Sequence, residues 1–161
     1  VQGFAATESD AAHQPSAADI AAVRAFRLTP GFLGKWLALA KDPKMPPPGI
    51  VLGKLKDGES VAAASAQLDA WPAVHRELGR QGLSSHDYLV GTVALFAAGF
   101  KLAEIEHPDL MKKNGMQSSG PDVATPANVA FMRAHKAEIE TAMRAGAAAH
   151  GETIPKPAPQ Q

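Results

Sequence analysis

The stretch that decides the fold is Leu83–Glu106, LSSHDYLVGTVALFAAGFKLAEIE. It is typical of one helix, because Ser84 is a favourable N-cap, Asp87 follows three residues later, and no proline interrupts the run. Apolar residues cover most of the helix circumference, which is the pattern of a helix buried at the centre of a domain. We therefore expect this segment to be the helix around which the rest of the chain packs.

The composition favours helices throughout. Alanine, the residue with the highest helix propensity, is abundant, whereas tyrosine occurs once among 161 residues. A chain of this length can bury a core within one domain. We predict an all-α, single-domain bundle of about four main helices plus short helices over residues 16–150. A flexible arm at 1–15 and a proline-rich tail at 151–161 flank it.

Capping residues predict where the other helices begin. Ser16, Thr29 and Thr125 each stand where an N-cap is needed, and a proline follows both threonines at the first helical position. Pro72 breaks or bends another helix, which ends before Gly82. The predicted helical regions are 16–41, 59–80, 84–106 and 126–149.

One segment has strand-like composition. Gly49–Lys56, GIVLGKLK, follows a cluster of prolines and is rich in β-branched and aliphatic residues. No second strand is available to pair with it. We therefore expect it to be an extended crossover between helices.

The central helix has two contrasting faces. Leu89, Val93 and Phe96 lie on one face, and Phe100 continues it. The opposite stripe consists of small residues such as Gly91 and its neighbours Ala94 and Ala98. We interpret this stripe as a thin solvent-facing edge; the alternative is close approach by another helix or a flat ligand.

A histidine on the last predicted helix is the first candidate for a binding site. His135 lies at helical spacing from Met132 and Ile139, on an apolar face. It is either a core histidine bonded to a carbonyl or a ligand to a bound group. In the second case Phe96, Phe100, Met132 and His135 would line a cavity for a small molecule, a metal or a haem with Met and His ligands.

The sequence also contains one E-x-x-H pair, Glu104 and His107. Di-metal bundles need that spacing twice, together with a glutamate from each of two other helices. We therefore interpret the pair as a solvated helix end, with Glu104 beside Lys101; metal binding by Glu104 and His107 is the alternative.

Several kinds of chemistry are disfavoured. The chain has no cysteine, which excludes disulfides, thiolate chemistry and cysteine-ligated zinc or iron–sulfur clusters. The 16 basic and 16 acidic residues balance, so the electrostatic signature of a nucleic-acid-binding protein is missing. Ser84–Asp87 contains the residue types of a catalytic triad, but capping explains these residues.

Tyr88–Phe100 is the longest helical run without a charge. It is too short to span a bilayer, so we expect no transmembrane segment.

Two short motifs carry a resemblance to a known group of proteins. These are Gly82-Leu83-Ser84, followed by Tyr88, and Thr125–Phe131, TPANVAF. The chain resembles exported, all-helical bacterial proteins of unknown function, and the resemblance covers about residues 20–145. It implies a secreted helical bundle and no activity. The small residues after Val1 are those expected beside a signal-peptide cleavage site, so we expect export, with a periplasmic location.

These observations favour a non-enzymatic exported protein that acts as a binding or assembly subunit for a protein partner or for copies of itself. No cofactor is expected for that function. The alternative is small-molecule, haem or metal binding in a bundle cavity near His135. A protein with no chromophore, no metal and no pocket beside that histidine would exclude the alternative.

Overall fold

The computed structural model describes residues 16–48, 60–116 and 122–149, and all regular structure in these ranges is helical. The predicted all-α class is therefore confirmed. The predicted arm 1–15, the crossover Gly49–Lys56 and the tail 151–161 lie outside the described residues. The helices are α2 (Ala17–Ala25), α3 (Pro30–Ala40), α5 (Val61–Asp69), α6 (Pro72–Arg80), α7 (Ser85–Glu106), α8 (Pro108–Lys113) and α9 (Pro126–Ala149).

The helices begin where the sequence predicts. At the starts of α2, α3, α7 and α9 a hydroxyl oxygen accepts a hydrogen bond from the backbone N–H three residues along, which satisfies a donor that the helix itself leaves unpaired. The capping residues are Ser16, Thr29, Ser84 and Thr125, at 3.1–3.2 Å from those nitrogens.

A glycine turn joins α6 to α7. Gly82 adopts φ +64°, the left-handed region that favours glycine. The N–H of Leu83 donates to the Leu78 carbonyl and that of Gly82 to the Gly79 carbonyl, both at 3.0 Å. This pair of bonds is a Schellman motif, and it satisfies the last carbonyls of α6 before the chain turns into α7.

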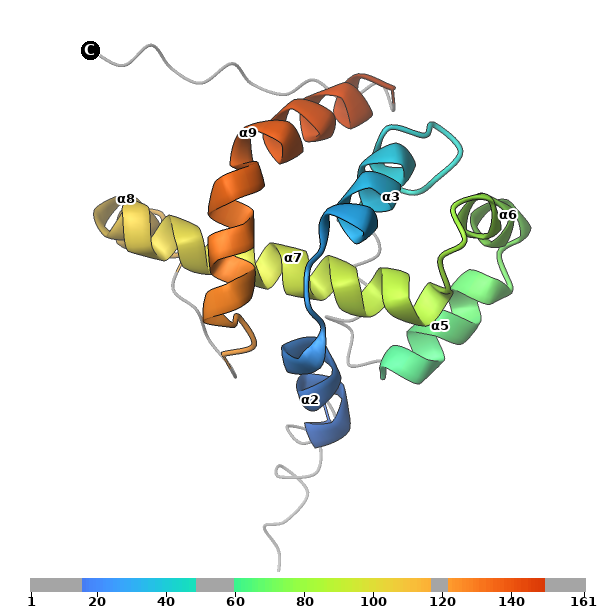
Figure 1. The fold of residues 1–161 in the computed structure, drawn as a ribbon, viewed down its shortest axis with the longest axis horizontal. Helices are drawn as coiled ribbons and strands as arrows, with labels where there is room; N and C mark the ends of the chain where they lie inside the picture. The colour runs from blue at the N-terminus through green and yellow to red at the C-terminus, as the bar shows by residue number, and fades with distance from the viewer. Residues whose placement is uncertain (1–15, 49–59, 117–121, 150–161) are drawn as a thin grey trace, which may run out of the picture.

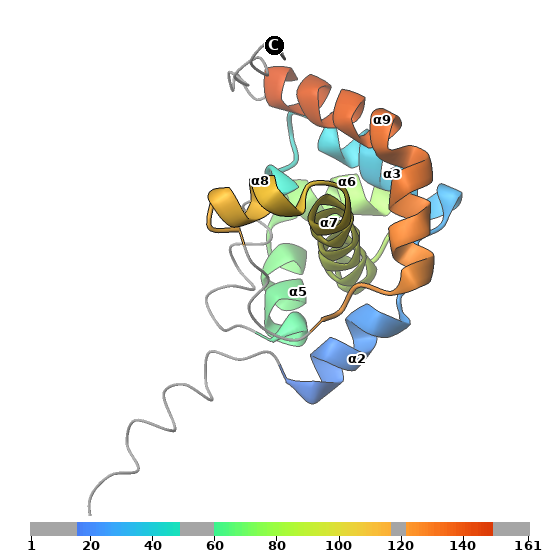
Figure 2. The same cartoon turned by 90° about the vertical axis from the view of Figure 1, so that its left-hand side faces the viewer.

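Helix α7 lies at the centre of the described structure (Figure 1). Viewed nearly along its axis in Figure 2, it is surrounded by α2, α3, α5, α6 and α9. It contacts each of the other six described helices. The predicted central position is therefore confirmed, and it explains why α7 is apolar over most of its circumference.

The buried faces of α7 differ from the predicted ones. From Tyr88 to Thr92 every residue is buried, and beyond them the small residues Ala94 and Ala98 are buried as well. The predicted core residues Val93 and Phe96 are only half-buried. Interpreting the small-residue stripe as a solvent-facing edge was therefore wrong.

Aromatic rings from the N-terminal helices occupy the small-residue stripe. A Cβ added at Gly91 would lie 2.5 Å from Cε2 of Phe32 and 2.9 Å from Cζ of Phe26. The two rings contact each other edge to face, with centroids 4.9 Å apart. Close approach, the alternative interpretation of the stripe, is what the packing requires.

Helix α9 contacts both α7 and α3, and it changes direction between the two (Figures 1 and 2). Thr141 donates its hydroxyl to the Ala137 carbonyl at 2.8 Å within this helix. Such a bond from a threonine to the carbonyl four residues back often bends a helix. Near the end of α9, Gly146 lies against the backbone carbonyl of Ala40, so that only glycine fits there.

A buried amide fastens the α2–α3 connection to α9. Asn128 is 1% exposed; its Oδ1 accepts from the Leu28 N–H at 3.0 Å, and its Nδ2 donates to the Phe26 carbonyl at 2.8 Å. Because both ends of the amide are paired, its burial leaves no unsatisfied polar group.

By length and composition alone, α7 could also cross a membrane. It has 22 residues, and its most apolar window has a mean hydropathy of 1.5. Half of that window is buried inside the fold, and the core helix of a soluble protein passes the same test. The absence of a transmembrane segment therefore stays a prediction.

Candidate functional site

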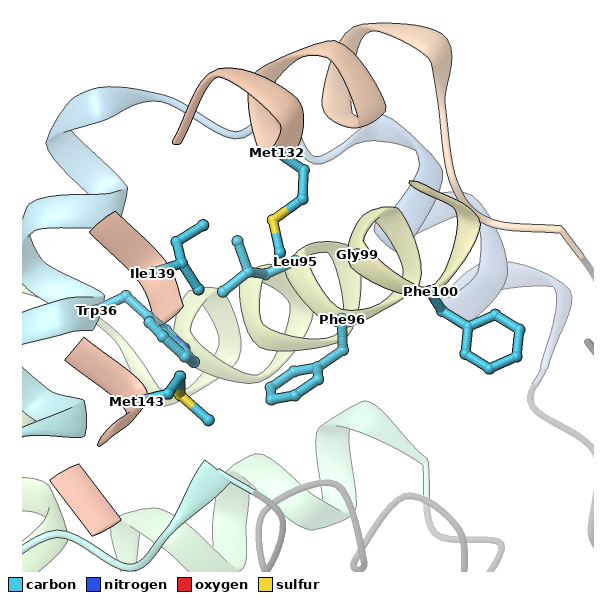
Figure 3. A pocket seen from close by; sticks show the side chains of 8 residues that line it. All are labelled: Trp36, Leu95, Phe96, Gly99, Phe100, Met132, Ile139 and Met143. Atoms are coloured by element: carbon cyan, nitrogen blue, oxygen red, sulfur yellow. The ribbon is translucent and has the colours of Figure 1, made fainter. Parts of the chain in front are cut away.

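A cavity of about 190 Å³ lies where α3, α7 and α9 meet (Figure 3). We refer to it as the α3–α7–α9 cavity. The residues that line it are Trp36 from α3, Leu95, Phe96, Gly99 and Phe100 from α7, and Met132, Ile139 and Met143 from α9.

Helical periodicity brings these residues together. On α7, Leu95 and Gly99 are one turn apart, as are Phe96 and Phe100. A Cβ added at Gly99 would lie 2.9 Å from Cε of Met132, so the missing side chain makes room for the methionine. Glycine in a helix interior costs about 1 kcal/mol relative to alanine. At Gly99 this cost is accepted so that Met132 of α9 can pack directly against α7.

The lining is apolar throughout. The only polar side-chain atom among the lining residues is the indole nitrogen of Trp36, which donates to Thr92 Oγ1 at 3.0 Å. Thr92 in turn donates to the backbone carbonyl of Tyr88 at 2.5 Å. Because the indole N–H is used within the core, the cavity presents no free donor, acceptor or charge to an occupant.

The buried tyrosine near this chain of bonds is held neutral. Tyr88 is 1% exposed, and burial raises its pKa to about 12 because desolvation disfavours the phenolate. It keeps its proton near neutral pH and does not line the cavity. Its role is therefore structural.

The structure brings three of the four predicted binding residues together and leaves one out. Phe96, Phe100 and Met132 line the cavity, whereas His135 does not. The side chain of His135 is 28% exposed, its Nδ1 lies 3.1 Å from Oε2 of Glu138, and its ring lies against Phe131 with centroids 4.2 Å apart.

The interpretation of His135 as a core histidine bonded to a carbonyl is therefore wrong, because its Nδ1 pairs with the Glu138 carboxylate and its side chain is only partly buried. Glu138 follows three residues later on the same helix, and side chains at that spacing are neighbours on a helix surface. Helical periodicity assumes a straight helix and one partner, so it places His135 on the apolar face.

The predicted metal pair, Glu104 and His107, gains no third metal ligand among the described residues. Glu104 lies 3.8 Å from Nζ of Lys101, which confirms the expected ion pair, and the same lysine lies 3.6 Å from Asp122. His107 is exposed at the junction of α7 and α8. Over residues 16–48, 60–116 and 122–149, no three histidine or acidic side chains form a group that could hold a metal ion.

The Ser84–Asp87 run has capping and structural roles. Ser84 caps α7, and Ser85 donates to Oδ1 of Asp69 at 2.5 Å. His75 lies 3.4 Å from the same carboxylate oxygen, so the carboxylate separates the serine from the histidine. A hydrolytic triad needs the histidine next to the serine. This cluster instead fastens the end of α5 to the start of α7.

Sequence reasoning missed the other five of the eight residues that line the cavity. Trp36, Leu95, Gly99, Ile139 and Met143 line it together with the predicted residues. Apart from Gly99, each resembles an ordinary core position in the sequence. Gly99 was the available signal, because a glycine within a long helix suggests close packing around it.

Comparison with protein families, characterised proteins and solved structures finds no match to this chain. The resemblance to exported helical proteins therefore stays a prediction. The cavity has to be interpreted from its own geometry.

Proposed function

We propose that this chain is a non-enzymatic binding protein whose α3–α7–α9 cavity receives an apolar side chain of a protein partner. The observation that carries the proposal is the lining, which is apolar on all sides and offers no free polar group. The same proposal includes a single bundle domain over residues 16–150 and export to the periplasm, as expected from the sequence.

The volume favours a side chain over a cofactor. Pockets for drug-sized molecules and cofactors are about 300–1,000 Å³, whereas an engineered cavity of about 150 Å³ in another protein binds benzene. At about 190 Å³, the α3–α7–α9 cavity is suited to one ring or one branched aliphatic group. A haem would need a larger pocket, and His135, the predicted axial ligand, does not line this one.

The absence of free polar groups in the cavity lining also favours a side chain as the occupant. Sites for small metabolites usually include a few polar groups that orient the ligand. Protein interfaces instead bury apolar anchors in well-packed pockets, and the surrounding surface supplies specificity. A purely apolar cavity is therefore better suited to an anchor side chain that belongs to a larger partner.

Two features of the lining suit an adaptable docking site. Met132 and Met143 are unbranched and polarizable, so they can repack around anchors of different shape. Phe96 and Phe100 are half-buried, and both rings extend from α7 in Figure 3. Their remaining exposed surface is available for burial against a partner.

The proposal is tested by site-specific photo-crosslinking. The photoreactive analogue p-benzoyl-phenylalanine replaces Phe100, and in a matched control it replaces Phe131, which is also half-buried but does not line the cavity. We expect a crosslink from position 100 to an apolar residue of one defined partner in the producing cells, and none from position 131. Equal crosslinking at both positions, or none at position 100, would refute the proposal.

The same cavity supports a second candidate, binding of a small apolar ring compound, because about 190 Å³ exceeds the volume that accepts benzene. Titration with indole, followed through the methionine methyl resonances, tests it. Saturable shifts at Met132 and Met143, with none at Met116, which does not line the cavity, would favour this candidate. Unchanged methyl resonances would remove it.

A further inference from the structure

Exposed apolar side chains gather at the end of α7 and around α8. Among the described residues the exposed large apolar side chains are Trp71, Ile105, Leu110 and Met116, and three of these four fall within residues 105–116. They are 53%, 56% and 52% exposed, in chain order. We call these three residues, together with Lys112 and Lys113 of the same segment, the α8 tip.

The backbone holds this tip in a defined shape. Gly115 has φ +67°, and the N–H of Met116 donates to the Met111 carbonyl at 2.8 Å, which closes a second Schellman motif. Met111 is buried, and this fixes the orientation of α8, so that Leu110 remains exposed. In both views α8 projects from the end of α7 away from the other helices (Figures 1 and 2). The tip therefore lies on a projecting helix.

The charge of the tip is positive. Neither Lys112 nor Lys113 forms an ion pair within the described residues, and Asp109 is the one acidic residue of α8. The neighbouring carboxylate of Glu106 lies 3.6 Å from Arg133 and 3.4 Å from Lys136, so it is already balanced by α9.

We propose that the α8 tip docks on the surface of an anionic lipid membrane. Apolar side chains beside lysines are the combination that partitions into the headgroup region, where the apolar groups enter the acyl boundary and the lysines meet the lipid phosphates. The inference is independent of the cavity, which lies between α3, α7 and α9.

Binding to vesicles tests the proposal with the full chain. We expect co-sedimentation with phosphatidylglycerol-containing vesicles, weaker binding to pure phosphatidylcholine vesicles, and loss of binding as salt is raised. The K112Q/K113Q variant should lower the partition coefficient about thirtyfold, since each lysine near an anionic surface contributes about 1 kcal/mol, and tenfold corresponds to about 1.4 kcal/mol. L110S should weaken binding about tenfold through the lost apolar contact.

Matched variants elsewhere on the surface serve as controls. W71S removes the exposed apolar residue outside the tip, and K41Q/K44Q removes two other exposed lysines. Both controls should bind vesicles like the original protein. Equal loss in the controls and the tip variants, or no binding to phosphatidylglycerol vesicles by the original protein, would overturn the proposal.

A gain-of-signal variant adds an independent measurement. L110W keeps an apolar group at the tip, and brominated lipid should quench its fluorescence more strongly than that of the original protein, whose tryptophans are Trp36 and Trp71. Identical quenching of the two proteins would overturn the proposed orientation of the tip. Quenching confined to L110W, together with the vesicle results, would establish it.

Discussion

Replacing Gly91 by alanine should destabilise the protein, although alanine is the better helix former. The added Cβ would lie 2.5 Å from a ring carbon of Phe32, about 1 Å inside the ordinary separation of about 3.5–4.0 Å between carbons. The ring cannot retreat freely, because Phe26 contacts it with centroids 4.9 Å apart.

The magnitude follows from three opposing contributions. Overpacking a core costs about 1–3 kcal/mol, and disturbing the Phe26–Phe32 pair costs about 0.5–1.5 kcal/mol. Removing a glycine from a helix interior returns about 1 kcal/mol. Urea denaturation of Gly91→Ala should therefore give an unfolding free energy lower by about 0.5–3.5 kcal/mol.

Two other glycines are matched controls. Gly34 in α3 has no atom within 4 Å of an added Cβ, so Gly34→Ala should raise stability by about 1 kcal/mol. Gly99→Ala should be nearly neutral, since the atom it meets is the mobile end of Met132. Adding Phe32→Leu to Gly91→Ala should recover part of the loss. If Gly91→Ala were as stabilising as Gly34→Ala, the close packing on α7 would be refuted.

Three further perturbations test the buried polar groups. Asn128→Leu should lower the unfolding free energy by about 2–4 kcal/mol in denaturant titration, because the Leu28 N–H and Phe26 carbonyl lose their partner; an unchanged midpoint would contradict this. Thr92→Val should cost about 1–3 kcal/mol by leaving the indole N–H unpaired, whereas Thr92→Ser, which keeps the hydroxyl, should cost less; equal losses would exclude the hydrogen bond as the cause. The pKa of Tyr88 is about 12 in the folded state and about 10 in the unfolded state. The stability that comes from this difference is therefore complete below pH 10 and is lost as the pH rises to 12. Relative to Tyr88→Phe, the original protein should therefore lose about 2–3 kcal/mol over that interval, and parallel pH profiles of the two proteins would contradict the burial.

The sequence was sufficient for the features set by local interactions. A hydroxyl and an amide three residues apart, as at Ser84 and Asp87, form a cap whatever surrounds them. The turn at Gly82 likewise depends on the few residues that form the two bonds of its Schellman motif. Such local features predict the beginnings of α2, α3, α7 and α9 and the end of α6.

Which faces are buried depends on partners that are distant in the chain. Gly91 is covered by rings from α2–α3, and no pattern within α7 identifies them. His135 lies on the apolar stripe by periodicity, but in the fold its side chain is 28% exposed and pairs with Glu138. For the same reason three of the eight cavity-lining residues were predicted and five were not.

The amide of Asn128 also has a consequence for biosynthesis. It pairs with Leu28, 100 residues earlier in the chain, and Arg24 pairs with the Asp122 carbonyl across a similar interval. At translation rates of about 5–20 residues per second, the first helices wait about 5–20 s for these partners. During that interval the aromatic rings of Phe26 and Phe32 have no α7 to cover them until residue 91 and its neighbours have emerged. The nascent chain should therefore be a client for chaperones that bind apolar segments until nearly all of it has been synthesised.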